Sequence, residues 1–113
     1  MPEPGPRFEN LVAAHLLKWV DLEQDTKGRD LELRYFRDVD GREVDFVVVE
    51  RRRPLLAVEC KWSDEPIARG LRYLKARFPD CEAWQISAAG KKDYMSAEAI
   101  RVAPALRLLS TLA

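Results

Sequence analysis

The sequence predicts a single α/β domain built on a mixed sheet, and three observations lead to this prediction. Apolar residues recur at three- and four-residue spacing over residues 8–20, which indicates an amphipathic helix. Segments rich in β-branched and aromatic residues occupy 31–36, 44–49, 55–62 and 83–87. The chain has 113 residues, 47% of them hydrophobic, which suits one packed core.

The N-terminal half is expected to contain one helix and an antiparallel meander. Residues 1–7 include three prolines, so we expect a flexible tail or linker remnant there and a domain over 8–113. The polar residues 21–30 are predicted to form a loop after the first helix. Asp40-Gly41 predicts a tight turn between the first two strands, and the third strand follows a short arginine-rich connection.

The C-terminal half is expected to add a parallel strand and two helices. Ser63 or Asp64 begins a predicted helix that Pro79 ends, and the strand at 83–87 completes a βαβ crossover. A short strand at 100–102 and a helix at 104–112 follow. The predicted fold is a mixed central sheet of four to five strands flanked by helices, in the order α-β-β-β-α-β-(β)-α.

Composition limits the classes of function. Lys plus Arg and Asp plus Glu both number 19, so nothing attracts the whole chain to nucleic acid or to an anionic membrane, and a polyanion site must be local. The two cysteines form no CxxC pair and no secretory leader is visible, so we expect a cytoplasmic protein with reduced thiols. No apolar run approaches the roughly 20 residues of a membrane span.

Two acids and a lysine lie inside the predicted strands. Asp45 follows Val44 in a β-branched strand, and Glu59 and Lys61 are two residues apart in the next, so their side chains share a face. If Asp45 lies beside Glu59, the two carboxylates repel unless a cation or Lys61 compensates them. Hard oxygen ligands favour Mg²⁺ or Mn²⁺, and the lysine can orient water. The alternative is an ordinary ion pair between Glu59 and Lys61.

The order of elements, taken with Asp45 and Glu59-Cys60-Lys61, resembles the PD-(D/E)XK superfamily of restriction-endonuclease-like nucleases and Holliday-junction resolvases. The resemblance covers nearly the whole chain and implies a restriction-endonuclease-like fold and Mg²⁺-dependent cleavage of DNA. It assigns catalytic roles to Asp45, Glu59 and Lys61. It implies metal ligation by Glu9 on the first helix, Asp45, Glu59 and the Cys60 carbonyl. One departure is Val44, which stands where the motif has proline.

A second resemblance concerns five short segments. They are similar to the uncharacterised C-terminal domain of prokaryotic AAA-type ATPases, and they read Phe8-Glu-Asn-Leu-Val12, Tyr35-Phe-Arg37, Gly41-Arg-Glu-Val-Asp-Phe46, Val58-Glu-Cys-Lys61 and Arg101-Val-Ala-Pro104. The resemblance implies a P-loop ATPase as a partner, and this chain itself has no G-x-x-x-x-G-K-[ST] segment. The alternative function is therefore a non-catalytic module that docks or regulates an ATPase, a view that the zero net charge favours.

Several other side chains have two interpretations each. Lys91 and Lys92 lie in a predicted loop and are either phosphate contacts or solvated charges. Residues 51–53, all arginine, favour a solvated turn over a DNA contact. Trp62 either seals the sheet edge or stacks on a base, and Gln85 either reaches the acidic site or is a polar residue at a strand end.

Overall fold

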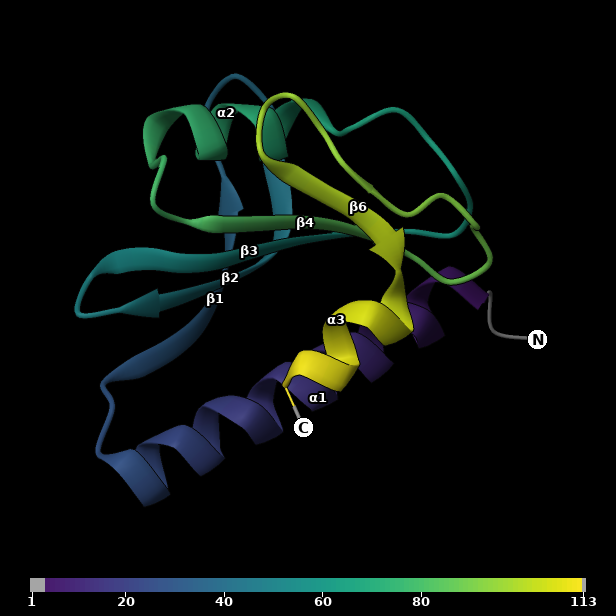
Figure 1. Ribbon diagram of the computed structural model, residues 1–113. Helices are drawn as coiled ribbons and strands as arrows, with labels where there is room; N and C mark the ends of the chain where they lie inside the picture. Colours follow the sequence, from purple (N-terminus) through teal and green to yellow (C-terminus); the bar gives the residue numbers. More distant parts are fainter. Residues whose placement is uncertain (1–3, 113) are drawn as a thin grey trace.

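The computed structural model describes residues 4–112, and these form a six-stranded mixed sheet with helices on both faces (Figure 1). This arrangement confirms the predicted α/β class. The elements in chain order are α1 (Pro4–Lys27), β1 (Leu31–Arg37), β2 (Glu43–Glu50), β3 (Arg53–Lys61), α2 (Arg69–Arg77), β4 (Glu82–Ser87), β5 (Tyr94–Met95), β6 (Ile100–Pro104) and α3 (Ala105–Thr111).

The strands lie in the order β1-β2-β3-β4-β6-β5. The first three pair antiparallel as a meander, while β4 is parallel to both β3 and β6. The predicted meander and parallel crossover are thus confirmed. Strand β5 was not predicted, because two residues are too few to show an alternating pattern, and it pairs antiparallel with β6 at the sheet edge.

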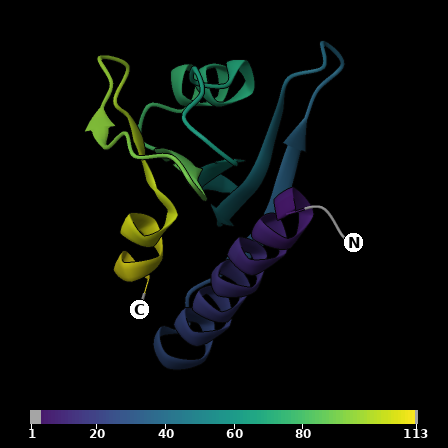
Figure 2. The same ribbon diagram turned by 90° about the vertical axis from the view of Figure 1, so that its right-hand side faces the viewer.

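Helices cover both faces of the sheet (Figures 1 and 2), and an apolar layer fills the space between the helices and each face. Helix α2 covers one face through Leu71 and Leu74, which pack with Val44, Val47 and other strand residues. Helices α1 and α3 cover the opposite face, where the buried residues are Val12, Leu16, Val20, Leu31, Val48, Leu56, Val58, Cys60, Ile86 and Leu108. Both cysteines are free and buried, one in each layer, so the sheet separates their thiols.

Helix α1 is longer at its start than the sequence predicts. It begins at Pro4, so the expectation of a non-helical tail was wrong for residues 4–7, and residues 1–3 lie outside the described part of the chain. Pro4 and Pro6 fall in the first helical turn, whose backbone N–H groups have no partner within the helix. The missing N–H groups of these prolines therefore cost no hydrogen bond.

Helix α1 also extends past the predicted loop boundary to Lys27. Residues 21–27 are polar but include good helix formers, and the ion pair between Glu23 and Lys27 spans one turn. Gly28 ends the helix with a φ of +65°, a conformation that glycine adopts without strain. The polar composition was thus a property of an exposed helix rather than of a loop.

Helix α2 begins later than predicted, at Arg69 rather than near Ser63. The preceding segment is held in an irregular conformation by Gln85, whose side chain accepts from the Ala68 N–H at 2.8 Å and donates to the Glu65 and Pro66 carbonyls, both at 3.1 Å. These bonds satisfy backbone groups that a helix would otherwise use. Gln85 is therefore a support for this segment.

Candidate functional site

The candidate site lies where β2 and β3 stop pairing. The antiparallel register of these strands runs to the pair Phe46 and Val58. Beyond it, two carboxylates take the backbone donors: the Asp45 N–H donates to Glu59 Oε1 at 3.0 Å, and the Cys60 N–H donates to Asp45 Oδ2 at 2.9 Å. Each acid therefore holds the backbone of the opposite strand, which fixes both carboxylates side by side.

A β-bulge sets the direction of Asp45. In the pairing of β1 with β2, Arg34 faces Val47 but Phe36 faces Val44, so β2 has one more residue than β1 in this interval. The bulge breaks the alternation of β2, because Val44 and Val47 both pack in the α2 layer although they are three residues apart. Bulges bend a strand and re-aim its side chains, which explains how Asp45 reaches the Cys60 N–H.

Glu59 and Lys61 share one face of β3, as their spacing predicts. Val58 and Cys60 point into the α1 layer, with Val58 fully buried, which leaves the alternate residues on the opposite side. Lys61 Nζ lies 3.6 Å from Glu59 Oε2, and the side chains are 26% and 12% exposed, respectively. The structure thus brings Asp45, Glu59 and Lys61 together, with the lysine at the more open side.

The electrostatic environment of Glu59 favours its protonated form. Burial, and next the charge of Asp45, raise the pKa of Glu59 to about 7, against a smaller opposing effect of Lys61. Glu9 on α1 is exposed, and its pKa is raised by partial desolvation and then by the charge of Asp45. Burial, followed by the charges of Asp45, Glu9 and Glu59, also raises the pKa of the Cys60 thiol.

The donor set fits a hard divalent cation in its chemistry. Two adjacent carboxylates with a repulsive interaction are the groups that Mg²⁺ or Mn²⁺ binds and relieves. Within residues 4–112, however, no three His, Cys, Asp or Glu side chains are grouped closely enough to hold a metal ion. Asp45 and Glu59 are therefore the assembled part of the site. Ligation by Glu9 and by the Cys60 carbonyl stays a prediction.

One further residue near β3 was misassigned from the sequence. Ser63 or Asp64 was expected to begin the second helix, but the Asp64 carboxylate accepts the backbone N–H groups of Lys91 and Lys92, at distances of 3.1 Å. The contact joins segments 27 and 28 residues apart, so no local spacing predicts it. A polar residue just after the carboxyl end of a parallel strand was the available signal.

The chain belongs to the family Domain of unknown function (DUF4143), whose model matches residues 4–108. No curated protein and no solved structure matches this chain. Among the helices of the described residues, none has the combination of length and apolar character needed to cross a membrane.

Proposed function

We propose that this domain is a Mg²⁺- or Mn²⁺-dependent phosphodiesterase that cleaves DNA, with a PD-(D/E)XK type of site. The observation that carries the proposal is the Asp45 and Glu59 pair at the point where β2 and β3 separate, with Lys61 3.6 Å from Glu59. A core built only for stability rarely sets two acids against each other beside a lysine. The same three residues carry the resemblance in sequence.

Each residue has a role that its position supports. Asp45 and Glu59 would hold the cation, which when bound activates a water molecule and offsets charge on the phosphate. Their hydrogen bonds to the facing backbone preorganise both carboxylates. Lys61, the more exposed partner, places its ammonium group where it attracts a phosphate and stabilises the charge that develops there.

A second candidate function is a docking or regulatory module for a P-loop ATPase. Exposed leucines favour it: Leu11, Leu17 and Leu22 on α1 are each about half exposed, and Leu106 on α3 is 78% exposed. Apolar side chains on neighbouring helices are typical of a protein contact. A module of this kind would keep the nuclease fold and need no metal.

Cleavage assays distinguish the two functions. We expect the wild-type chain with Mg²⁺ or Mn²⁺ to cleave at least one of duplex, single-stranded and branched DNA. Asp45→Asn and Lys61→Ala should each lower the rate by about 100-fold or more, because the first removes a ligand of the cation and the second removes positive charge beside the reacting phosphate. Arg51→Ala, at an exposed turn, serves as the control and should cleave normally. A wild-type chain inactive on every form of DNA would overturn the enzyme and favour the docking module.

A further inference from the structure

The loop that follows β4 is fastened to the end of β3 that carries Lys61. The parallel register of these strands ends with Lys61 facing Ser87. Two more backbone bonds continue it: the Ala88 N–H donates to the Lys61 carbonyl at 3.1 Å, and the Ala89 N–H donates to the Trp62 carbonyl at 2.7 Å. Residues 88–92 therefore begin directly beside the candidate site.

Asp64 holds the next part of this loop in one conformation. Its carboxylate accepts the backbone N–H groups of Lys91 and Lys92, and these two bonds are the leading reason why the pKa of Asp64 lies below its usual value. Gly90 permits the approach, because a Cβ there would lie 2.5 Å from Asp64 Oδ1 and from Ser87 Oγ. The loop is thus built to a specific shape.

The ordered backbone leaves the lysine side chains available. Lys91 and Lys92 are both exposed, and neither forms a salt bridge within residues 4–112, although Asp64 offsets part of their charge. Many arginines of the described chain are instead paired with acids, as Arg42 and Arg72 are. Although the net charge of the chain is zero, this loop therefore carries two exposed lysines, and it begins beside the end of β3 that carries Lys61.

An exposed tryptophan is bonded through its backbone to this basic loop. Trp62 follows Lys61 directly, is 46% exposed, and is bound through its carbonyl to Ala89. It is therefore not the sealed core residue that is the more common role of tryptophan at a sheet edge. Aromatic side chains beside lysines are the features that bind single strands, where a ring stacks on a base and ammonium groups contact the backbone. A duplex keeps its bases stacked inside and offers Trp62 no such partner.

We propose that Trp62, Lys91 and Lys92 form a contact surface for single-stranded DNA, with the lysines on phosphates and Trp62 on an unpaired base. The proposal deepens the nuclease function and rests on it for its purpose, because the surface begins at the end of β3 that carries Lys61. The binding itself requires neither metal nor cleavage.

Binding is measured on the full chain by fluorescence anisotropy, with a labelled oligothymidylate of about 12 nucleotides, in EDTA and over a range of salt concentrations. Lys91→Ala combined with Lys92→Ala should weaken binding and lower the magnitude of the salt slope by about 1.4. Trp62→Ala should weaken binding by about 5- to 100-fold, and Trp62→Phe should restore most of it. A duplex of equal length should bind less tightly and respond little to Trp62→Ala.

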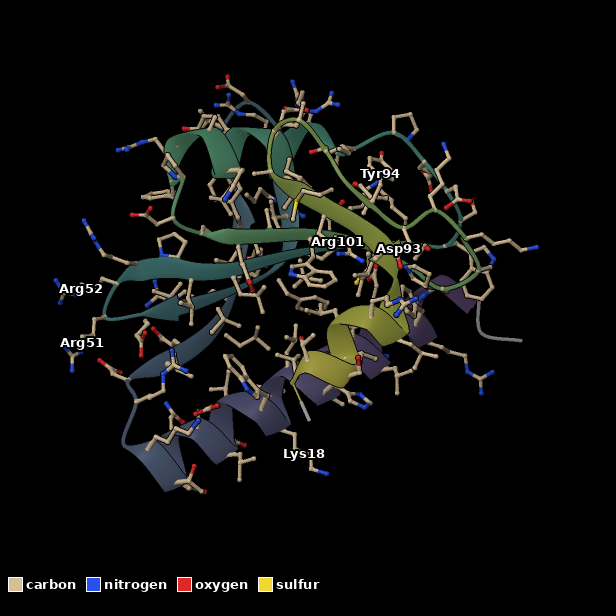
Figure 3. The ribbon with its side chains drawn as sticks, viewed as in Figure 1. Lys18, Arg51, Arg52, Asp93, Tyr94 and Arg101 are labelled. Atoms are coloured by element: carbon tan, nitrogen blue, oxygen red, sulfur yellow. The ribbon has the colours of Figure 1, made fainter. Side chains whose placement is uncertain are left out.

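The matched control is Arg51→Ala combined with Arg52→Ala, which removes the same charge. Figure 3 shows these two arginines at the end of the sheet away from Asp93 and Tyr94, the residues that follow the basic loop in the chain. This control should bind almost as the wild type does. No binding by the wild type, equal losses for the two double variants, or indifference to Trp62→Ala would overturn the proposal. Absence of cleavage in the separate assay with Mg²⁺ or Mn²⁺ would instead count against the nuclease alone. The binding measurement is made in EDTA and does not depend on cleavage.

Discussion

A glutamate lies at each end of the β2 and β3 hairpin, and the pKa values of the two are shifted in opposite directions. At the closed end, Glu50 accepts two hydrogen bonds from Arg29, at 2.8 and 3.0 Å, and these bonds lower the pKa of Glu50. At the open end, Glu59 is buried beside Asp45, and its pKa rises to about 7. One glutamate is matched by a cation of the chain itself, and the other faces an acid with only a lysine 3.6 Å away.

The difference separates a structural carboxylate from a candidate functional one. A guanidinium beside a carboxylate stabilises the ionised form of that acid in the folded state, so the acid needs no further cation. A buried glutamate beside a second acid makes folding less favourable at neutral pH unless a cation joins the two carboxylates. Acids with raised pKa values and an unfavourable neighbour cluster at functional sites, so this pair is the candidate for binding a cation.

The largest expected effect comes from removing the charge at the open end. Because the pKa of Glu59 is raised from 4.5 to about 7, the folded state holds more protons than the unfolded state between these values, so stability falls as pH rises through that window. Glu59→Gln should abolish this slope and raise the free energy of unfolding by up to about 3 kcal/mol at about pH 8. Urea unfolding in EDTA at several pH values measures it.

The exposed Glu82→Gln provides the control for this experiment, and its stability curve should run close to that of the wild type. A Glu59→Gln curve parallel to the wild type across the same pH range would show that Glu59 ionises normally. The contrast between the two ends of the hairpin would then be lost.

A smaller effect is expected at the closed end. Arg29→Ala removes both hydrogen bonds to Glu50 and should cost about 1 kcal/mol at neutral pH, because the pair is partly exposed. The pKa of Glu50 is lowered, so this stability is present above the unfolded pKa of 4.5 and is lost as pH falls through the folded value. Chemical unfolding should therefore show wild type and variant converging in acid. A cost independent of pH would contradict the assigned role of the ion pair.

Much of the site follows from the sequence because strand geometry is regular. Adjacent strands and a two-residue spacing were sufficient to predict that Asp45, Glu59 and Lys61 converge. The bulge at Asp45 was not predictable, since no residue there is special to a bulge. The late start of α2 was missed because Gln85, from a later strand, binds the segment before it. Contacts between distant segments leave no local signal.

The most direct test of the central claim, that Asp45 and Glu59 form a cation site, is the melting temperature with and without Mg²⁺. With a Kd of about 1 mM, Mg²⁺ at about 10 mM should stabilise the fold by about 1.4 kcal/mol and raise its Tm by about 5 °C over NaCl of equal ionic strength. Asp45→Asn should abolish this rise, whereas Lys61→Ala should preserve or enlarge it by removing a competing charge. No rise for the wild type, or an equal rise for Asp45→Asn, would contradict the account.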